Sequence, residues 1–152
     1  MVIVFVEDKA LKLFVEKLCS RLRIPCRPRM PVTGGGGWTG VLERVRDTDP
    51  KEFRIVGIIE GDARKKAEKI EFWDSVSNRI FITRKNELED YLYEKRERIV
   101  AMADLTPGTT YPKFKHFFNK DAPEITFNRI LSDLSKQDCE EITSLVAFIK
   151  GC

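Results

Sequence analysis

Short apolar runs recur along the first half of the chain. VIVFV at 2–6, RIVGII at 54–59 and RIFIT at 79–83 are rich in β-branched residues, which is typical of strands covered on both faces. Residues 26–32 form a weaker candidate strand, because two prolines interrupt them. We therefore expect four strands.

Helical patterns separate these runs. Apolar residues of the segment 9–22 recur at steps of three and one, which places them on one helical face, and Pro25 follows. Asn86 is a candidate N-cap for the last helix of this half. The expected helices are 9–22, 41–45, 63–70 and 87–93. Strands alternating with helices predict an α/β fold with a mainly parallel four-stranded sheet flanked by helices.

The pattern changes after about residue 95. A turn-rich loop at 106–112 precedes a stretch in which helices dominate, and 135–138 resembles a capping signal between two of them. Their apolar stripes are Phe127, Ile130, Leu131 and Leu134, then Ile142, Leu145, Val146 and Ile149. We expect one domain, with an α/β core at about 1–95 and a C-terminal helical extension at about 96–152.

Composition narrows the class of protein. A chain with 42% hydrophobic and 34% charged residues is typical of globular proteins, and no apolar stretch approaches the roughly 20 residues that cross a bilayer. The N-terminus lacks the basic start and cleavage site of a signal peptide. We expect a cytoplasmic protein with no membrane partner. The formal net charge of +3 permits a nucleic-acid partner without requiring one.

Cysteine and histidine are scarce. The four cysteines form no C-x-x-C pair and the only histidine is His116, so neither a zinc site nor a Ser-His-Asp or Cys-His mechanism is favoured. Cys19 and Cys139 fall on helical patterns, and we expect buried, reduced thiols there. His116 is expected on the surface.

Acidic residues follow two of the expected strands. Glu7 ends the first, whereas Glu60 and Asp62 end RIVGII with a glycine between them. The carboxyl ends of parallel strands meet at one edge of a sheet, and side chains two apart on a strand point to the same face. Three converging carboxylates repel one another unless a cation such as Mg²⁺ lies among them. Alternatively, the acids are solvated strand ends or helix N-caps.

The order of these segments resembles a known family. VFVEDKALKLF, a glycine-rich loop, GIIEGD and RIFITRKNELEDYL together look like the Toprim domain, particularly that of OLD-family nucleases, over residues 2–94. In that family a glutamate closes the first strand, Asp-x-Asp closes a later one, and another glutamate precedes a short helix. By motif, the corresponding acids here are Glu7, Glu60 with Asp62, and Glu87 or Glu89.

The resemblance implies a Toprim-like fold whose acids bind Mg²⁺ or Mn²⁺ and act in phosphodiester cleavage. Two positions depart from the pattern: Glu60 stands where the family has aspartate, and Leu11 stands where OLD nucleases have a further acid. These departures leave two alternatives: the site binds one metal ion instead of two, or it has lost catalysis. No tyrosine has an assignable nucleophilic role, so water is the expected attacking group.

Basic and glycine-rich segments supply further candidates. An arginine cluster suits phosphate contacts, although solvated surface is the commoner role of such clusters. The four consecutive glycines of TGGGGWTG are expected in a loop whose bare backbone could approach a phosphate beside the acids; a plain flexible loop is the alternative. The same loop also fits G-x-G-x-x-G, but the segment before it carries two prolines and is not the first strand of the chain. These candidates for nucleic-acid binding are Arg21, Arg23, Arg27, Arg29, Gly35, Gly36 and Gly37.

The segment YPKFKHFFNK at 111–120 alternates basic and aromatic residues. A platform that stacks single-stranded bases has this composition. Phe114, Phe117 and Phe118 are also spaced as on one helical face, which favours a core role.

Three functions follow as hypotheses. The first is a Mg²⁺- or Mn²⁺-dependent nuclease that cleaves DNA or RNA at the acid cluster. The second is a non-catalytic Toprim-like module that binds nucleic acid or a partner protein such as an ATPase subunit. The third is a nucleotide-binding protein that uses the glycine loop.

Overall fold

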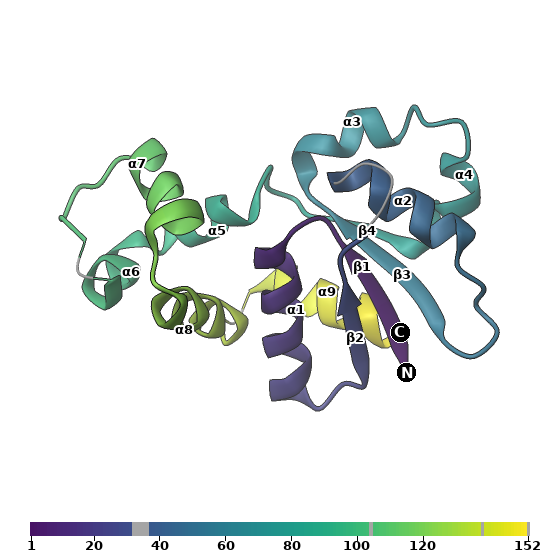
Figure 1. The fold of residues 1–152 in the computed structure, drawn as a ribbon, viewed down its shortest axis with the longest axis horizontal. Helices are drawn as coiled ribbons and strands as arrows, with labels where there is room; N and C mark the ends of the chain where they lie inside the picture. Colours follow the sequence, from purple (N-terminus) through teal and green to yellow (C-terminus); the bar gives the residue numbers. More distant parts are fainter. Residues whose placement is uncertain (32–36, 104, 138, 152) are drawn as a thin grey trace.

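A four-stranded parallel sheet lies at the centre of the protein, in the order β2-β1-β3-β4 (Figure 1). The computed structural model describes residues 1–31, 37–103, 105–137 and 139–151. The strands are β1 Val2–Val6, β2 Cys26–Arg29, β3 Arg54–Ile59 and β4 Ile80–Ile82. The predicted α/β class, with a parallel sheet, flanking helices and a helical C-terminal part, is confirmed.

The sheet divides the apolar core into two layers. On β1, Val4 and Val6 face one layer and Phe5 faces the other; on β3, Ile58 and Ile59 alternate in the same way. This alternation with both faces apolar explains why the central strands appear in the sequence as uninterrupted apolar runs.

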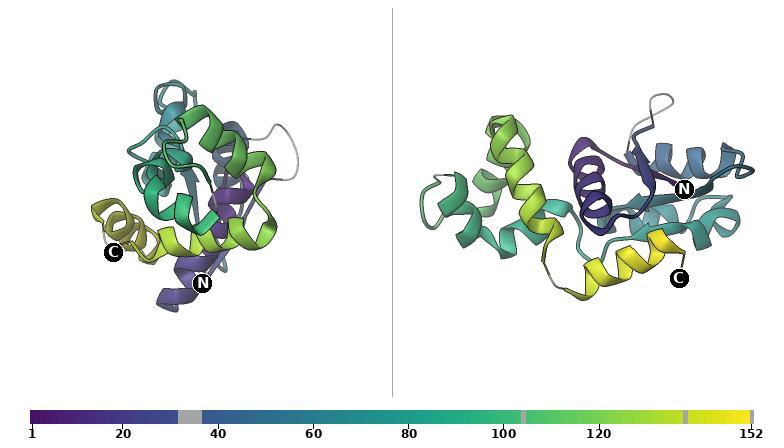
Figure 2. Two further views of the ribbon diagram at one scale, coloured as in Figure 1. Left: turned by 90° about the vertical axis from the view of Figure 1, so that its left-hand side faces the viewer. Right: turned by 90° about the horizontal axis from the view of Figure 1, so that it is seen from below.

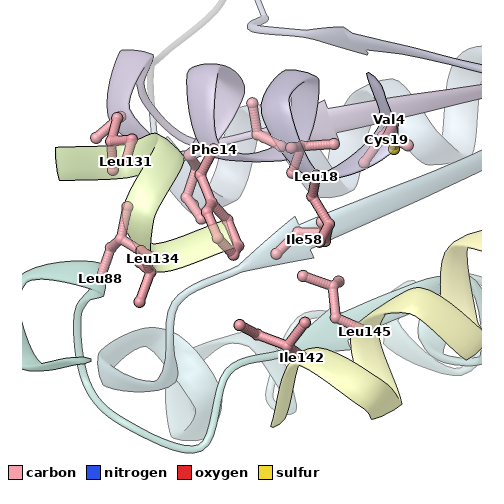
Figure 3. Close-up of a cluster of buried hydrophobic side chains, with 14 of the residues drawn as sticks. Val4, Phe14, Leu18, Cys19, Ile58, Leu88, Leu131, Leu134, Ile142 and Leu145 are labelled. Atoms are coloured by element: carbon pink, nitrogen blue, oxygen red, sulfur yellow. The ribbon is translucent and has the colours of Figure 1, made fainter. Parts of the chain in front are cut away.

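The larger layer contains α1 Lys9–Leu22, α8 Glu124–Ser135 and α9 Glu140–Lys150. Figure 3 shows side chains of α1 meeting Ile58 of β3, with Leu134 of α8 and Leu145 of α9 around them. The predicted apolar stripes are the buried faces of α8 and α9, since the residues at their centres are almost fully inaccessible. The C-terminal helices therefore complete the core of the sheet.

The smaller layer lies on the opposite face, where α2 Gly37–Asp47 and the short α3 Arg64–Ala67 and α4 Trp73–Val76 pack. Gly57 of β3 permits this packing. A β-carbon there would lie 2.7 Å from Cγ1 of Val41 on α2, well inside contact distance. Helix α2 thus sits directly on the strand that leads to the candidate acids.

The remaining helices gather beyond the carboxyl ends of the strands, at one end of the sheet (Figures 1 and 2). They are α5 Leu88–Glu94, α6 Arg96–Ala103, α7 Tyr111–His116 and the π-helical turn η3 Phe117–Asp121. From here α8 packs against α1, and α9 returns along the sheet (Figure 1). The helical extension is consequently placed next to the edge where the candidate acids lie.

Several predicted helix boundaries are wrong. Helix α2 begins at Gly37, four residues before the predicted start, so Gly37 is helical and not part of a loop. Helix α3 ends at Ala67, and α6 was not predicted at all. The N-cap of α5 is Glu87 and not Asn86. The start of α2 was not predicted because it lies among glycines. Helix α6 was not predicted because its apolar residues are only weakly gathered on one face.

Two expectations about single residues have opposite outcomes. Cys19 is buried as predicted, but Cys139 is exposed because it occupies the N-cap of α9, outside the apolar stripe that its helix buries. Asp138, in the predicted capping signal, lies outside the described residues. His116 is on the surface, as expected, with its side chain 68% exposed.

Candidate functional site

Parallel pairing brings the ends of β1 and β3 to the same edge of the sheet. Val6 pairs with Ile58, so Glu7 and Glu60, which follow these strands, lie at the same level. The loop after β4 reaches this edge too, since the Leu88 amide at the start of α5 donates a 2.5 Å hydrogen bond to Oε2 of Glu60. Candidate acids from three separate segments therefore adjoin one another.

Glu60 is deeply enclosed, with only 6% of its surface exposed. Burial and, to a smaller extent, the nearby carboxylates of Asp8 and Glu7 raise the pKa of Glu60 to about 10, although the hydrogen bond from the Leu88 amide opposes the rise. Glu60 is consequently a neutral acid at pH 7 in the absence of a cation.

Glu7 accepts a hydrogen bond from the protonated carboxyl group of Glu60. The pKa of Glu7 is raised to about 7, mainly by burial; hydrogen bonding to Glu60 lowers it, and the charges of Asp62 and Asp8 raise it. Two carboxyl groups that share a proton titrate as a pair. The shared proton relieves the repulsion between the two carboxyl groups, as a bound cation would also do.

Gly61 fixes the backbone between the two acids that follow β3. Its amide donates to the Thr83 hydroxyl oxygen at 2.9 Å and to the Lys85 carbonyl at 3.2 Å. A β-carbon at Gly61 would lie 2.4 Å from the Lys85 carbonyl oxygen and 2.6 Å from that of Thr83. Glycine is therefore required at this position by the close approach of the loop after β4.

Asp62 is exposed and lies just after β3, in the 3₁₀ turn η1 Gly61–Ala63. Because β3 ends at Ile59, the alternation of a strand does not extend to Asp62, and the expected geometric reason for its proximity to Glu60 is absent. Its charge still raises the pKa of Glu7, so it belongs to the same cluster. The residue that caps η1 is Glu60, not Asp62.

Glu89 is the second deeply buried acid, 6% exposed on α5. Burial raises its pKa to about 7, and the charges of Glu87 and Asp8 contribute in the same direction. The structure therefore places both alternatives for the fourth acid near the site. Their environments differ, because Glu87 is already paired with cationic and hydroxyl groups.

The partners of Glu87 come from the helical extension. Nζ of Lys115 on α7 lies 2.6 Å from Oε2 of Glu87. The Tyr111 hydroxyl donates to Oδ1 of Asp90 at 2.5 Å and lies 3.3 Å from Oε2 of Glu87. Helix α7 is in this way attached to the start of α5 at the edge of the acid cluster.

The predicted site residues did not include three neighbours of the site: Asp8, Tyr111 and Lys115. Asp8 carries a recognisable signal, since an aspartate directly before a helical pattern predicts an N-cap, and it accepts a hydrogen bond from the Leu11 amide at 2.9 Å. Tyr111 and Lys115 lie 24 and 28 residues after Glu87, and no local pattern links them to it.

The aromatic residues of 111–120 belong mainly to the core. Phe114 is inaccessible and Phe118 is 2% exposed, so the core interpretation is confirmed for these two. Phe117 is partly buried against the same layer. A stacking platform for bases would have to use other side chains.

The arginine candidates lie on the surface around β2. Arg21, Arg23, Arg27 and Arg29 are all exposed, and Arg21 donates a hydrogen bond to the Ser135 carbonyl. Arg29 pairs with Phe5 in the β2–β1 register, two residues before Glu7, and so lies nearest the acid edge. Of the glycines, Gly35 and Gly36 lie outside the described residues, and Gly37 starts α2.

The donor chemistry of the cluster fits a hard divalent cation, because every candidate ligand is a carboxylate oxygen. Two of the acids, Glu60 and Glu89, are buried with raised pKa values, so they carry protons that such a cation could replace. Within the described residues, however, no three His, Cys, Asp or Glu side chains are arranged to hold a metal ion. Binding of an ion by both Glu7 and Glu60 would require the proton between them to leave.

Comparisons of the chain with protein-family models, with curated proteins and with solved structures found no match in any of the three. None of the described helices is long and apolar enough to cross a membrane.

Proposed function

We propose that this protein is a divalent-metal-dependent nuclease that cleaves phosphodiester bonds at the edge formed by Glu7, Glu60 and Asp62. The observation that supports it most is the enclosure of several carboxyl groups at the carboxyl ends of parallel strands, with pKa values of about 7 and about 10 for Glu7 and Glu60. Enclosing acids costs free energy, and a bound cation would compensate for it.

Glu7, Glu60, Asp62 and Glu89 would hold Mg²⁺ or Mn²⁺. When bound, the ion supplies Lewis-acid polarisation of a phosphoryl oxygen. Glu7 is the candidate general base if the other three acids hold the ion, because its carboxylate could then accept a proton from an attacking water. The ammonium group of Lys115, which is paired with Glu87, is a candidate contact for a substrate phosphate beside the acid cluster.

The resemblance to the Toprim domain of OLD-family nucleases agrees with this proposal in motif order. DNA or RNA is the substrate, and Arg29 is the candidate contact for its backbone at the near edge of β2. A cytoplasmic location belongs to the same proposal.

The test is cleavage of plasmid, single-stranded DNA and RNA with Mg²⁺ or Mn²⁺, before and after removal of the ion by a chelator. We expect Glu7→Gln and Asp62→Asn each to reduce cleavage at least about 100-fold, as loss of a group acting at the reacting centre does. Glu68→Gln, a change at an exposed acid of the neighbouring segment, is the matched control and should retain full activity. Cleavage that persists in both Glu7→Gln and Asp62→Asn would refute the proposal.

One observation favours a second function, that of a non-catalytic module. Oε2 of Glu60 accepts a hydrogen bond from the Leu88 amide, and the Glu60 carboxyl group also donates one to Glu7. The glutamate side chain, longer than the aspartate of the Toprim pattern, thus has hydrogen-bond partners without an ion. Such a protein would bind nucleic acid or a partner protein such as an ATPase subunit. Stable complexes with nucleic acid, without cleavage under any metal condition, would support this alternative.

A further inference from the structure

A cavity of about 290 Å³ adjoins the acid cluster and is lined by the start of α1, by η3 and by the start of α8. It begins directly at the candidate acids, because Asp8 in its wall is the residue that follows Glu7. A cavity of this size accommodates a single nucleobase with its sugar, since small-molecule sites begin at about 300 Å³. The lining side chains that could contact a ligand are Asp8, Lys9, Phe118, Asn119, Glu124 and Phe127.

The backbone fixes the segments that enclose the cavity. Oδ1 of Asp8 accepts a hydrogen bond from the Leu11 amide at 2.9 Å, which holds this side chain at the beginning of α1. The turn η3 is π-helical: the Ala122 amide donates to the carbonyl of Phe117, five residues earlier, at 2.7 Å. Single π-helical turns are rare and occur frequently at functional sites. Only Ala122 and Pro123 separate η3 from α8, so the two sides of the cavity that these elements form are held close together.

Phe118 and Phe127 form the apolar side of the cavity. Their rings are stacked, with centroids 4.8 Å apart and planes at 26°. Phe118 is 2% exposed and belongs to the core, whereas Phe127 is only partly buried, so Phe127 presents the accessible aromatic surface. Nζ of Lys9 lies 6.0 Å from the centre of the Phe127 ring, at the outer limit of a cation–π contact. Phe127 therefore offers a base a stacking surface, and Lys9 offers the attached phosphate a cation.

The polar lining suits the hydrogen-bond donors of a base. Glu124 and Asn119 are exposed, and together with Asp8 they supply two carboxylates and one amide. Two carboxylates against the one ammonium group of Lys9 leave the cavity acidic, which disfavours a free phosphate as its ligand. Guanine suits a carboxylate best among the bases, because its N1–H and its 2-amino group lie side by side and donate together. The lining therefore favours a neutral base whose Watson–Crick edge is unpaired.

We propose that this cavity binds one unpaired nucleobase, guanine in preference to the others, from a single-stranded segment whose backbone passes the acid cluster. That the ligand belongs to a strand rests on the proposed function. Sequence-specific recognition of single strands combines stacking on an aromatic side chain with hydrogen bonds to the Watson–Crick edge, and the cavity supplies both. The recognised base thus sets where along the strand the acid cluster meets the backbone.

The first experiment measures binding without cleavage, by fluorescence anisotropy in a chelating buffer. The ligands are labelled oligothymidylate strands in which the central base is thymine, guanine, adenine or cytosine. We expect the guanine strand to bind about tenfold more tightly than the all-thymine strand, which is the discrimination that one bidentate pair supplies. Guanosine 5′-monophosphate is the competitor that separates a strand from a free nucleotide. It should displace the labelled strand only at concentrations at least about tenfold above those of the unlabelled strand, because the cavity is acidic.

Variants at exposed positions assign the preference to the cavity. Glu124→Gln and Asn119→Ala should each reduce the preference for guanine to less than about threefold, while the all-thymine strand binds as it does to the control. That control is Glu68→Gln, a matched change of an exposed acid outside the cavity, which should keep the full preference. Phe127→Leu should weaken the binding of all four strands by about tenfold, as the loss of one stacked base does. Because Phe127 also packs against the core, thermal unfolding verifies that this variant is folded.

Three results would overturn the proposal: equal affinity for all four strands, a guanine preference that survives both Glu124→Gln and Asn119→Ala, or displacement of the strand by guanosine 5′-monophosphate at equal concentration. The binding assay contains no free metal ion, so its outcome is independent of whether the acid cluster cleaves nucleic acid. Cleavage without any base preference in binding would refute the base-binding cavity and leave the proposed nuclease intact. Base-selective binding with no cleavage under any metal condition would do the reverse.

Discussion

Gly61 is the residue on which the position of the acids most directly depends. It is enclosed by carbonyl oxygens of Thr83 and Lys85, which belong to the backbone and cannot rotate away as a side chain can. The sequence showed a glycine between two acids, but the approach of a loop more than 20 residues later has no signal in the neighbouring residues. Contacts of this kind are set by the tertiary fold.

We therefore expect Gly61→Ala to lower the free energy of unfolding by about 3 kcal/mol, because the added methyl group must displace backbone. Urea denaturation followed by circular dichroism measures this change. Gly108→Ala is the comparison: no atom lies within 4 Å of its β-carbon position, and only its φ of +83° disfavours a side chain. It should cost about 1 kcal/mol. An equal loss in the two variants would show that crowding at Gly61 is unimportant.

At the scale of elements, the strands were predictable and the helix ends less so. β1 and β3 are apolar on both faces, which produces an unmistakable run, whereas the start of α2 at Gly37 lies among glycines that usually indicate a loop. The acids after the strands were found because topology alone places them together. Glu89 and Glu87 could not be told apart, since their difference arises from partners on α7.

Attachment of α7 to the start of α5 can be tested with two tyrosines. Tyr111→Phe removes the hydroxyl that donates to Asp90 and should lower the free energy of unfolding by about 1 to 2 kcal/mol, since the acceptor is a charged group. Tyr93→Phe removes a hydroxyl whose nearest acceptor, the Thr109 carbonyl, is 3.5 Å away, and should change stability by less than about 0.5 kcal/mol. Thermal unfolding of both variants decides; equal effects would contradict a specific role for Tyr111.

At the scale of the whole molecule, the enclosed acids make stability depend on pH. Glu7 and Glu89 have pKa values of about 7 and Glu60 of about 10, all above the ordinary 4.5. At a pH between the ordinary value of 4.5 and these folded-state pKa values, the folded state binds more protons than the unfolded state. The stability contributed by the protonated acids is therefore complete below about pH 4.5 and is lost as the pH rises through the folded values.

In a chelating buffer, we expect the melting temperature to fall as the pH rises from about 5 to about 8, and Mn²⁺ to restore it at the upper end. Glu60→Gln mimics the protonated acid, so its melting temperature should fall less steeply with pH than that of the wild type. Glu68→Gln, at an exposed position, should follow the wild type. Identical pH profiles for all three proteins would mean that Glu60 does not carry the proton assigned to it.

The most direct measurement of the central claim is calorimetric titration of Mn²⁺ into the protein at about pH 7.5, in two buffers of different ionisation enthalpy. If the ion replaces the proton shared by Glu7 and Glu60, binding must release about one proton per ion, which the difference between the buffers reports. The account predicts that release in the wild type and weaker binding by at least about tenfold in Glu7→Gln. No binding, binding without proton release, or equal affinity in Glu7→Gln would contradict it.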